Sequence, residues 1–189
     1  MDEHAHTAPS GFSFTERISV RRERPGDFDA IDHLLREAFL DAPFSDHTEH
    51  ELVHRLRRTT AYIPDLALVA DFDHTPIGYV MMTAAEVMGR ENTSKIALLA
   101  PLAVLPDFRG LGIGRRLMHE AHAEALRHGF PAVVLIGMPE FYAPLGYRPC
   151  SDFGLIFRDD VPDRYTLAMP LTSDAIQQGI VLWDKAFDE

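Results

Sequence analysis

The sequence predicts an α/β protein of the α+β type, with a single domain over residues 16–189 and a disordered tail over 1–15. Short apolar runs of strand length alternate with segments whose apolar residues recur at helical spacing. Two of these runs, 66–70 and 77–83, flank a turn-rich segment, which is typical of an antiparallel hairpin. A third run, 95–105, leads through three glycines into a long helical pattern.

The first half of the chain is expected to form a strand, two helices and the hairpin. Residues 18–21 alternate in polarity and predict a strand. A helix is expected from Pro25–Asp27 to Phe39, because Ile31, Leu34 and Leu35 share one face with Phe39. The remaining expectations are a break at 41–46, a helix over 48–58, strands over 66–70 and 77–83, and a turn at 73–76.

The second half is expected to contain a long helix between buried strands. Its apolar residues Ile113, Leu117, Ala121 and Ala125 recur every four positions, and Gly129 is a typical helix stop. This predicts a helix over 112–128. The other expected elements are strands over 95–105 and 132–137, a short helix over 139–145, and strands around Tyr147 and over 154–157, 166–169 and 180–183.

Composition narrows the class of protein. A length of 189 residues with 46% hydrophobic and 25% charged residues is ordinary for a globular domain, and no apolar run is long enough for a membrane span. The net charge of −11 disfavours nucleic-acid binding. The polar N-terminus lacks the features of a secretory signal, and the single cysteine, Cys150, fits a reducing compartment. We therefore expect a cytoplasmic location.

The glycine-rich segment after Pro106 predicts an anion site. Arg109, Gly110, Gly112 and Gly114 lie between an apolar strand and a helix, where free backbone N–H groups and the helix dipole favour a phosphate. The segment lacks the lysine of a P-loop, and its glycines are too closely spaced for a dinucleotide fingerprint. A glycine-rich turn without a ligand is the alternative interpretation.

Two motifs resemble one known family. Arg109-Gly-Leu-Gly-Ile-Gly114 fits the Arg/Gln-x-x-Gly-x-Gly/Ala pyrophosphate loop of the GNAT N-acetyltransferases, and residues 101–106 resemble the family's fourth strand. Phe141-Tyr-Ala-Pro-Leu-Gly-Tyr147 resembles the family's F-Y-x-x-L-G-[FY] segment. The order of the expected elements is similar to the family's fold over nearly the whole length from Ile18. Gly137-Met-Pro-Glu140 stands where many relatives carry an asparagine.

The resemblance implies a fold and a cofactor site. The fold is a mixed, mostly antiparallel sheet with helices on both faces and a splay between strands 4 and 5. Pro101, which cannot donate to a strand ladder, is expected to perturb pairing there. The co-substrate implied is acetyl-CoA, without a metal. Its pantetheine arm would lie on the backbone of Leu102, Ala103 and Val104, and its pyrophosphate on Arg109, Gly110, Leu111, Gly112, Ile113, Gly114 and Arg115.

The resemblance also implies a reaction. An amine would attack the thioester directly, a backbone N–H near residues 102–104 would stabilise the oxyanion, and Tyr142 would protonate the departing thiolate. Core packing is the alternative role for Tyr142. The base is Glu86 or a chain of waters, because residues 95–100 contain no carboxylate. The acceptor is a small-molecule or protein amine, and residues 171–189 could contribute to a homodimer.

Two other functions compete with this interpretation. His50-Glu-Leu-Val-His54 is a formal H-E-x-x-H zinc-hydrolase motif, but Arg57 and Thr60 stand where its extended form needs Gly and His. A solvated histidine face that includes His47 is the expected interpretation of this segment. The second alternative is an acyl-CoA sensor without turnover, against which the presence of Tyr142 argues.

Overall fold

The computed structural model describes residues 17–43, 45–157 and 161–188, so the predicted tail over 1–15 lies outside the described residues. The strands are β1 (Ile18–Arg22), β2 (Tyr62–Phe72), β3 (Thr75–Met88), β4 (Thr93–Val104), β5 (Ala132–Ile136), β6 (Arg148–Pro149), β7 (Leu155–Ile156), β8 (Thr166–Pro170) and β9 (Gly179–Leu182). They form one sheet in the order β1-β2-β3-β4-β5-β8-β6, and β9 pairs with both β3 and β7. Only the pairs β4–β5 and β7–β9 are parallel among the described strands, so the sheet is mixed and mostly antiparallel, as predicted.

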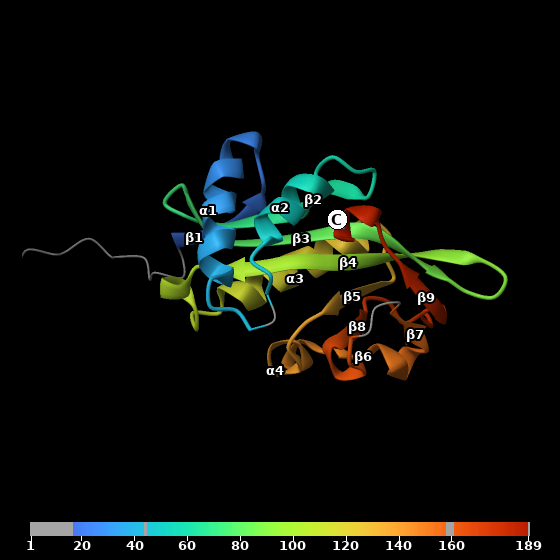
Figure 1. Ribbon diagram of the computed structural model, residues 1–189. Helices are drawn as coiled ribbons and strands as arrows, with labels where there is room; N and C mark the ends of the chain where they lie inside the picture. Colours follow the sequence, from blue (N-terminus) through green and yellow to red (C-terminus); the bar gives the residue numbers. More distant parts are fainter. Residues whose placement is uncertain (1–16, 44, 158–160, 189) are drawn as a thin grey trace, which may run out of the picture.

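Helices cover both faces of this sheet, as the resemblance implied (Figure 1). α1 (Phe28–Phe39) and α2 (Glu49–Leu56) lie on one face, which we call the front, and α3 (Ile113–Arg127) lies on the other, the back. α4 (Pro139–Tyr142) is a short helix at the end of β5 that continues into a 3-10 turn, Ala143–Leu145. Other 3-10 turns are Pro25–Asp27, Pro106–Phe108, Cys150–Phe153, Asp163–Tyr165 and Lys185–Phe187.

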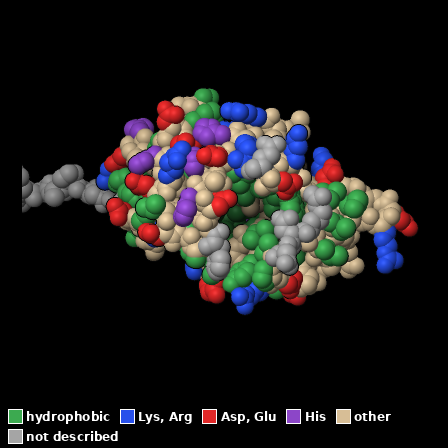
Figure 2. Space-filling model, viewed as in Figure 1, with side chains coloured by type: hydrophobic (Ala, Val, Ile, Leu, Met, Phe, Trp, Pro, Cys, Tyr) green, Lys and Arg blue, Asp and Glu red, His purple; other side chains and the backbone are tan. Residues whose placement is uncertain are grey.

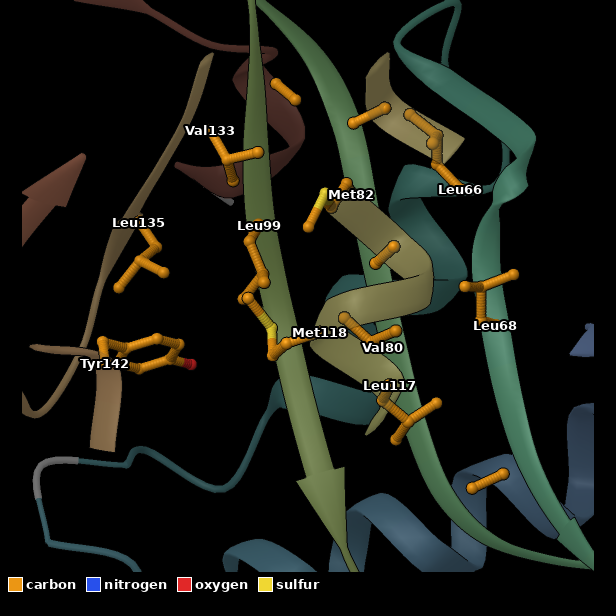
Figure 3. Close-up of a cluster of buried hydrophobic side chains, with 14 of the residues drawn as sticks. Leu66, Leu68, Val80, Met82, Leu99, Leu117, Met118, Val133, Leu135 and Tyr142 are labelled. Carbon is orange, nitrogen blue, oxygen red and sulfur yellow. The ribbon is translucent and has the colours of Figure 1, made fainter. Parts of the chain in front are cut away.

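The sheet separates two layers of buried side chains because successive strand residues point to opposite faces. On the back, Val80, Met82 and Leu99 pack with Leu117 and Met118 of α3 (Figure 3). On the front, α1 and α2 pack their apolar faces on the alternate strand residues, such as Tyr79, Met81 and Ala103. A third cluster continues the front layer toward β5 and β9 and includes Ala85, Leu98 and Val134.

The predicted elements are all present among the described residues, with some bounds changed. β2 and β3 extend well beyond the predicted strands 66–70 and 77–83. The turn between them is tighter than the expected 73–76: Asp73 and His74 alone have positive φ, 50° and 66°, which matches the right-handed twist of a hairpin. Thr75 and Pro76 therefore already belong to β3.

The predicted splay lies between β4 and β5. The two strands pair only at Ala97–Val133 and Leu98–Val134, and their pairing ends there. Just beyond, the register of β4 against β3 shifts: Leu99 lies opposite Met82 and Leu102 opposite Val80, so Ala100 and Pro101 face Met81 alone. Such a bulge bends its strand. The irregularity that Pro101 was expected to cause is therefore present.

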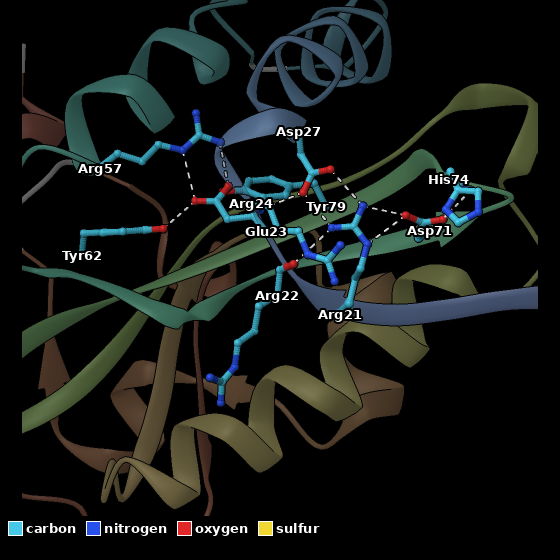
Figure 4. Close-up of polar contacts among 10 residues, drawn as sticks. All are labelled: Arg21, Arg22, Glu23, Arg24, Asp27, Arg57, Tyr62, Asp71, His74 and Tyr79. Atoms are coloured by element: carbon cyan, nitrogen blue, oxygen red, sulfur yellow. Dashed lines mark hydrogen bonds and ion pairs between the residues drawn. The ribbon is translucent and has the colours of Figure 1, made fainter.

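A buried ionic network, which the sequence did not predict, holds the front helices to the sheet (Figure 4). Arg57, directly after α2, donates to both carboxylate oxygens of Glu23 at 3.1 and 2.7 Å. The hydroxyls of Tyr62 and Tyr79 donate to the same carboxylate at 2.6 and 2.9 Å. Burial, with the Glu23 charge second, raises the pKa of both tyrosines. A carboxylate with three hydrogen-bonding neighbours tolerates burial, because its lost hydration is replaced.

Candidate functional site

The glycine loop presents free backbone donors to solvent. Gly110 and Gly112 have φ of 78° and 80°, and a Cβ at either would meet nothing within 4 Å. Glycine is needed there for its backbone conformation, and the space beside it stays open to a ligand. The first bond of α3 runs from the N–H of Arg116 to the carbonyl of Gly112 at 3.0 Å. The N–H groups of Ile113, Gly114 and Arg115 therefore have no acceptor within the helix, and no side chain caps it.

Gly114 has a different role from the other two glycines. It is buried inside the first turn of α3, and a Cβ there would lie 3.2 Å from Cζ of Phe141. The phenylalanine of the F-Y segment thus packs on the glycine loop. The two sequence motifs meet in space, and the small size of Gly114 permits the contact.

Arg109 lies at the start of the glycine loop, and its side chain contacts two backbone carbonyls. Its Nη2 donates to the carbonyl of Ala38 in α1 at 2.6 Å, and its Nε donates to the carbonyl of Val104 at 3.2 Å. The guanidinium thus bridges α1 and the end of β4. Arg115 is exposed in the first turn of α3, beside the free N–H groups.

The end of β4 offers backbone groups to the splay. The N–H of Leu105 bonds to the carbonyl of Ile77 in β3, so strand alternation directs the polar groups of Ala103 toward β3 as well. Those of Leu102 and Val104 consequently face the opposite edge, where β5 has diverged. The contact between Arg109 and the Val104 carbonyl agrees with this orientation. Of the three predicted residues, Leu102 and Val104 thus expose hydrogen-bonding groups to the opening.

Tyr142 lies in the same opening. Its ring belongs to the back cluster, between β4 and β5, and its hydroxyl points toward β4 (Figure 3). The residue is 8% exposed, and none of the described residues hydrogen-bonds to its hydroxyl. Burial raises the pKa of the phenol above its ordinary value of 10, at which it is already protonated at neutral pH.

Gly137 and Tyr147 both pack against the Tyr142 ring. A Cβ at Gly137 would collide with the Tyr142 ring, so the glycine that replaces the family's asparagine makes room for the phenol. Tyr147 packs edge-on against Tyr142 at 5.4 Å between centroids, and its own hydroxyl lies 2.8 Å from Nε2 of His122 on α3. Burial, with His119 as a second cause, lowers the pKa of His122 to about 4. Tyr147 is therefore held by a neutral histidine, whereas the Tyr142 hydroxyl has no such partner.

Glu86 is not brought to the splay. It is exposed near the end of β3, between Lys95 of β4 and Leu182 of β9. Four residues separate it from Met82, which is about 13 Å along a strand. Alternation with Ala85 and Val87, which are in the front layer, directs its side chain to the back. Cys150 is buried, and burial raises the pKa of its thiol to about 12, which agrees with a core residue and not a nucleophile.

The front face is hollowed over the middle of the sheet. Figure 2 shows this hollow between the layer of α1 and α2 and the β5 side of the molecule, with hydrophobic side chains on its floor. The front-facing residues nearest the splay are apolar, including Met81, Leu98 and Val134. Ile136, at the end of β5, is 48% exposed on the same face. The front side of the splay is thus lined by apolar strand residues, and none of the front-facing strand residues named here is a carboxylate.

The histidines of the H-E-x-x-H motif do not converge. His50 is only 4% exposed, so the expected solvated histidine face is wrong for this residue. Its Nε2 has no hydrogen-bond partner and lies 3.6 Å from Oε1 of Glu51. His54 instead pairs with Asp32 at 2.7 Å, and His47 contacts the carbonyl of Phe39. Within residues 17–43, 45–157 and 161–188, no three His, Cys, Asp or Glu side chains are grouped as metal ligands.

Comparison with known proteins agrees with this geometry. The model of the Acetyltransferase (GNAT) family matches residues 28–147, more than half of the chain. The chain belongs to the GNAT family of acetyltransferases. The match runs from the start of α1 through the glycine loop to Tyr147 and so includes both motifs.

Individual GNAT relatives cover most of the chain. The uncharacterized N-acetyltransferase YhbS of Escherichia coli is 36% identical over 130 residues, 68% of this chain and 72% of YhbS. The uncharacterized N-acetyltransferase YjhQ of the same organism is 30% identical over 108 residues, which is 60% of its length. The crystal structure of YhbS in complex with CoA has a TM-score of 0.82 at 30% identity and covers 98% of this chain and 97% of its own. A Brucella melitensis GNAT acetyltransferase in complex with acetyl-CoA has a TM-score of 0.75 at 27% identity and covers 90% of this chain and 98% of its own.

Proposed function

We propose that this GNAT protein transfers the acetyl group of acetyl-CoA directly to a primary amine. One observation carries the proposal: the splay between β4 and β5 joins free N–H groups at the start of α3 to a buried Tyr142 hydroxyl, to which no described residue hydrogen-bonds. A phosphate site at one end and a proton donor further in are what a thioester of a phosphorylated carrier requires. Two similar structures, the YhbS complex with CoA and the Brucella melitensis complex with acetyl-CoA, support the choice of coenzyme.

The coenzyme would bind along the splay. Its pyrophosphate accepts from the N–H groups of residues 110–115, assisted by the dipole of α3 and by the exposed Arg115. Its pantetheine arm pairs with the outward-facing backbone of Leu102 and Val104, as an additional strand would. This pose brings the thioester between β4 and β5, beside Tyr142.

The amine would enter from the front hollow and attack the thioester carbon, forming the C–N bond. A backbone N–H of residues 102–104 stabilises the oxyanion, a contribution of typically about 3 kcal/mol to the barrier. Collapse breaks the C–S bond, and the Tyr142 hydroxyl gives its proton to the thiolate. The proton released by the amine returns to the tyrosinate through water. No enzyme nucleophile takes part, and positioning of the two substrates supplies much of the rate.

The acceptor carries its amine on a small molecule or on a protein. In either case, the group next to the amine would lie on the hydrophobic floor of the hollow (Figure 2), on the face where Ile136 of β5 is exposed. An amine must be neutral to attack. Desolvation on such a floor disfavours the ammonium form and helps it to lose its proton.

We propose that water, rather than Glu86, accepts the proton that the acceptor ammonium loses. Glu86 is distant from the splay along β3, and its side chain points to the back. Glu86→Gln is therefore expected to keep turnover within about twofold of the native protein, with acetyl-CoA and a panel of amines as substrates. Thiol release is the measurement. A loss of about 100-fold with unchanged coenzyme affinity would instead assign the base to Glu86.

The coenzyme site is tested without knowledge of the acceptor. Calorimetric titration of the native protein with acetyl-CoA should show binding, and Gly112→Asp should abolish it by placing a carboxylate against the pyrophosphate. Gly129→Asp is the matched control, because Gly129 ends the same helix with φ of 77° and equally open space. Both variants carry the same backbone strain. A loss of acetyl-CoA affinity in Gly112→Asp but not in Gly129→Asp would therefore come from the introduced carboxylate beside the ligand.

Three results would reject parts of this proposal. Failure of the native protein to bind acetyl-CoA would remove the coenzyme assignment. Equal affinity of Gly112→Asp and Gly129→Asp would remove the loop from the site. Tight binding without thiol release across the amine panel would favour a sensor over an enzyme.

A further inference from the structure

The side chain of Arg109 joins three parts of the proposed site. Its backbone lies at the start of the glycine loop, its Nη2 donates to the carbonyl of Ala38 and its Nε to the carbonyl of Val104. The first contact spans 71 residues of sequence. A guanidinium suits this task, because its fixed fork reaches two acceptors at once.

The end of α1 needs this external donor. In a continuing helix, the N–H of residue 42 would bond to the carbonyl of Ala38, but the N–H of Ala42 bonds to the carbonyl of Phe39 at 3.1 Å. Nη2 of Arg109 instead donates to the carbonyl of Ala38, at 2.6 Å. The contact also sets a cation against the negative end of the α1 dipole.

The end of α1 borders the proposed acceptor side. Ala38 packs in the front cluster with Ala103, the residue between Leu102 and Val104 on β4. α1 therefore ends over the part of β4 whose opposite edge would hold the pantetheine arm. A movement of the Arg109 side chain would therefore change its contacts both with the end of α1 and with the end of β4.

We propose that Arg109 is a positioning residue that couples coenzyme binding at the glycine loop to the order of the α1 C-terminus. This inference rests on the proposed function for its coenzyme. When the pyrophosphate fixes residues 110–115, the adjoining Arg109 is fixed with them, and its two carbonyl contacts hold α1 against the front face. The side chain acts through the protein and does not bind the phosphates.

The experiment compares native protein with Arg109→Met, Arg109→Lys and the control Arg90→Met, at an exposed arginine in the turn between β3 and β4. Hydrogen exchange of the amides of residues 40–42 is measured with and without CoA, together with the calorimetric Kd for CoA. We expect both Arg109 variants to bind CoA within about threefold of native protein. In both, CoA should no longer slow exchange in residues 40–42, although residues 110–115 remain protected. Lysine should not rescue, because it has one donor nitrogen at the end of its chain, whereas Arg109 donates from both Nε and Nη2.

The contacts of Arg109 with the Ala38 and Val104 carbonyls, which we call the tether, are tested without ligand. Exchange in residues 40–42 should be faster in both Arg109 variants than in native protein or Arg90→Met, at unchanged thermal midpoint. A CoA affinity that Met lowers tenfold and Lys restores would overturn the inference, because Arg109 would then be a phosphate ligand. Unchanged exchange in residues 40–42 would overturn it as well. Native protein that fails to bind CoA would reject the proposed function, while the ligand-free comparison still decides the tether.

Discussion

Tyr142 shows at the level of one residue how packing places a phenol in the splay. Its ring lies in the back cluster, its hydroxyl points toward β4, and burial raises the pKa of the phenol above its ordinary value of 10. Tyr142→Phe is expected to lower turnover by about 100-fold and leave the Kd for acetyl-CoA nearly unchanged, because only the proton transfer is lost. Thiol release and calorimetry measure the two quantities.

Tyr147→Phe is the control for this prediction. It removes a hydroxyl from the same aromatic group, but one that His122 already binds at 2.8 Å. Turnover should be maintained at a small cost in stability. Full activity of Tyr142→Phe would exclude the phenol as the acid.

At the level of elements, the packing of α3 against α4 joins the glycine loop to the F-Y segment. Gly114→Val is expected to lower the free energy of unfolding by about 1–3 kcal/mol, because its side chain would overlap Phe141. Phe141→Ala should relieve this overlap. Chemical denaturation of both single variants and the double variant measures the coupling, and additive losses would show that the two elements do not touch.

At the level of the whole molecule, the buried His122 predicts a pH dependence of stability. Its pKa of about 4 lies below the ordinary 6.5, so the unfolded chain binds more protons between these values. Stability attributable to His122 is therefore lost as the pH falls from 6.5 to 4, by roughly 3 kcal/mol at the lower limit. Burial is the first cause of the lowered pKa and the neighbouring His119 the second, and the Tyr147 hydroxyl is the hydrogen-bond partner of His122.

Thermal unfolding across this pH range measures the effect. His122→Gln keeps a polar partner for Tyr147 but cannot ionise, so its stability should fall less steeply with acid than that of native protein. His33→Gln, at a histidine side chain that is 73% exposed, should follow the native profile. Parallel profiles for native protein and His122→Gln would contradict the lowered pKa.

Prediction from sequence succeeded where the information is local. The order of strands and helices follows from apolar spacing over a few residues, and the glycine loop from backbone torsions that only glycine adopts easily. The positive φ of Gly110 and Gly112 and the free N–H groups of α3 confirm that local geometry. The predicted roles of Tyr142 and of the loop in binding and catalysis remain predictions.

The sequence by itself determined the GNAT fold, because its periodicity and its two motifs each lie within a short stretch of chain. Only the tertiary structure decided what distant residues do. The register of β3 directs Glu86 to the back, and the packing of α2 buries His50, which sequence placed in solvent. Arg109 meets Ala38 because the sheet brings α1 beside the end of β4. Such contacts depend on strand register and helix packing across many residues, and no local pattern encodes them.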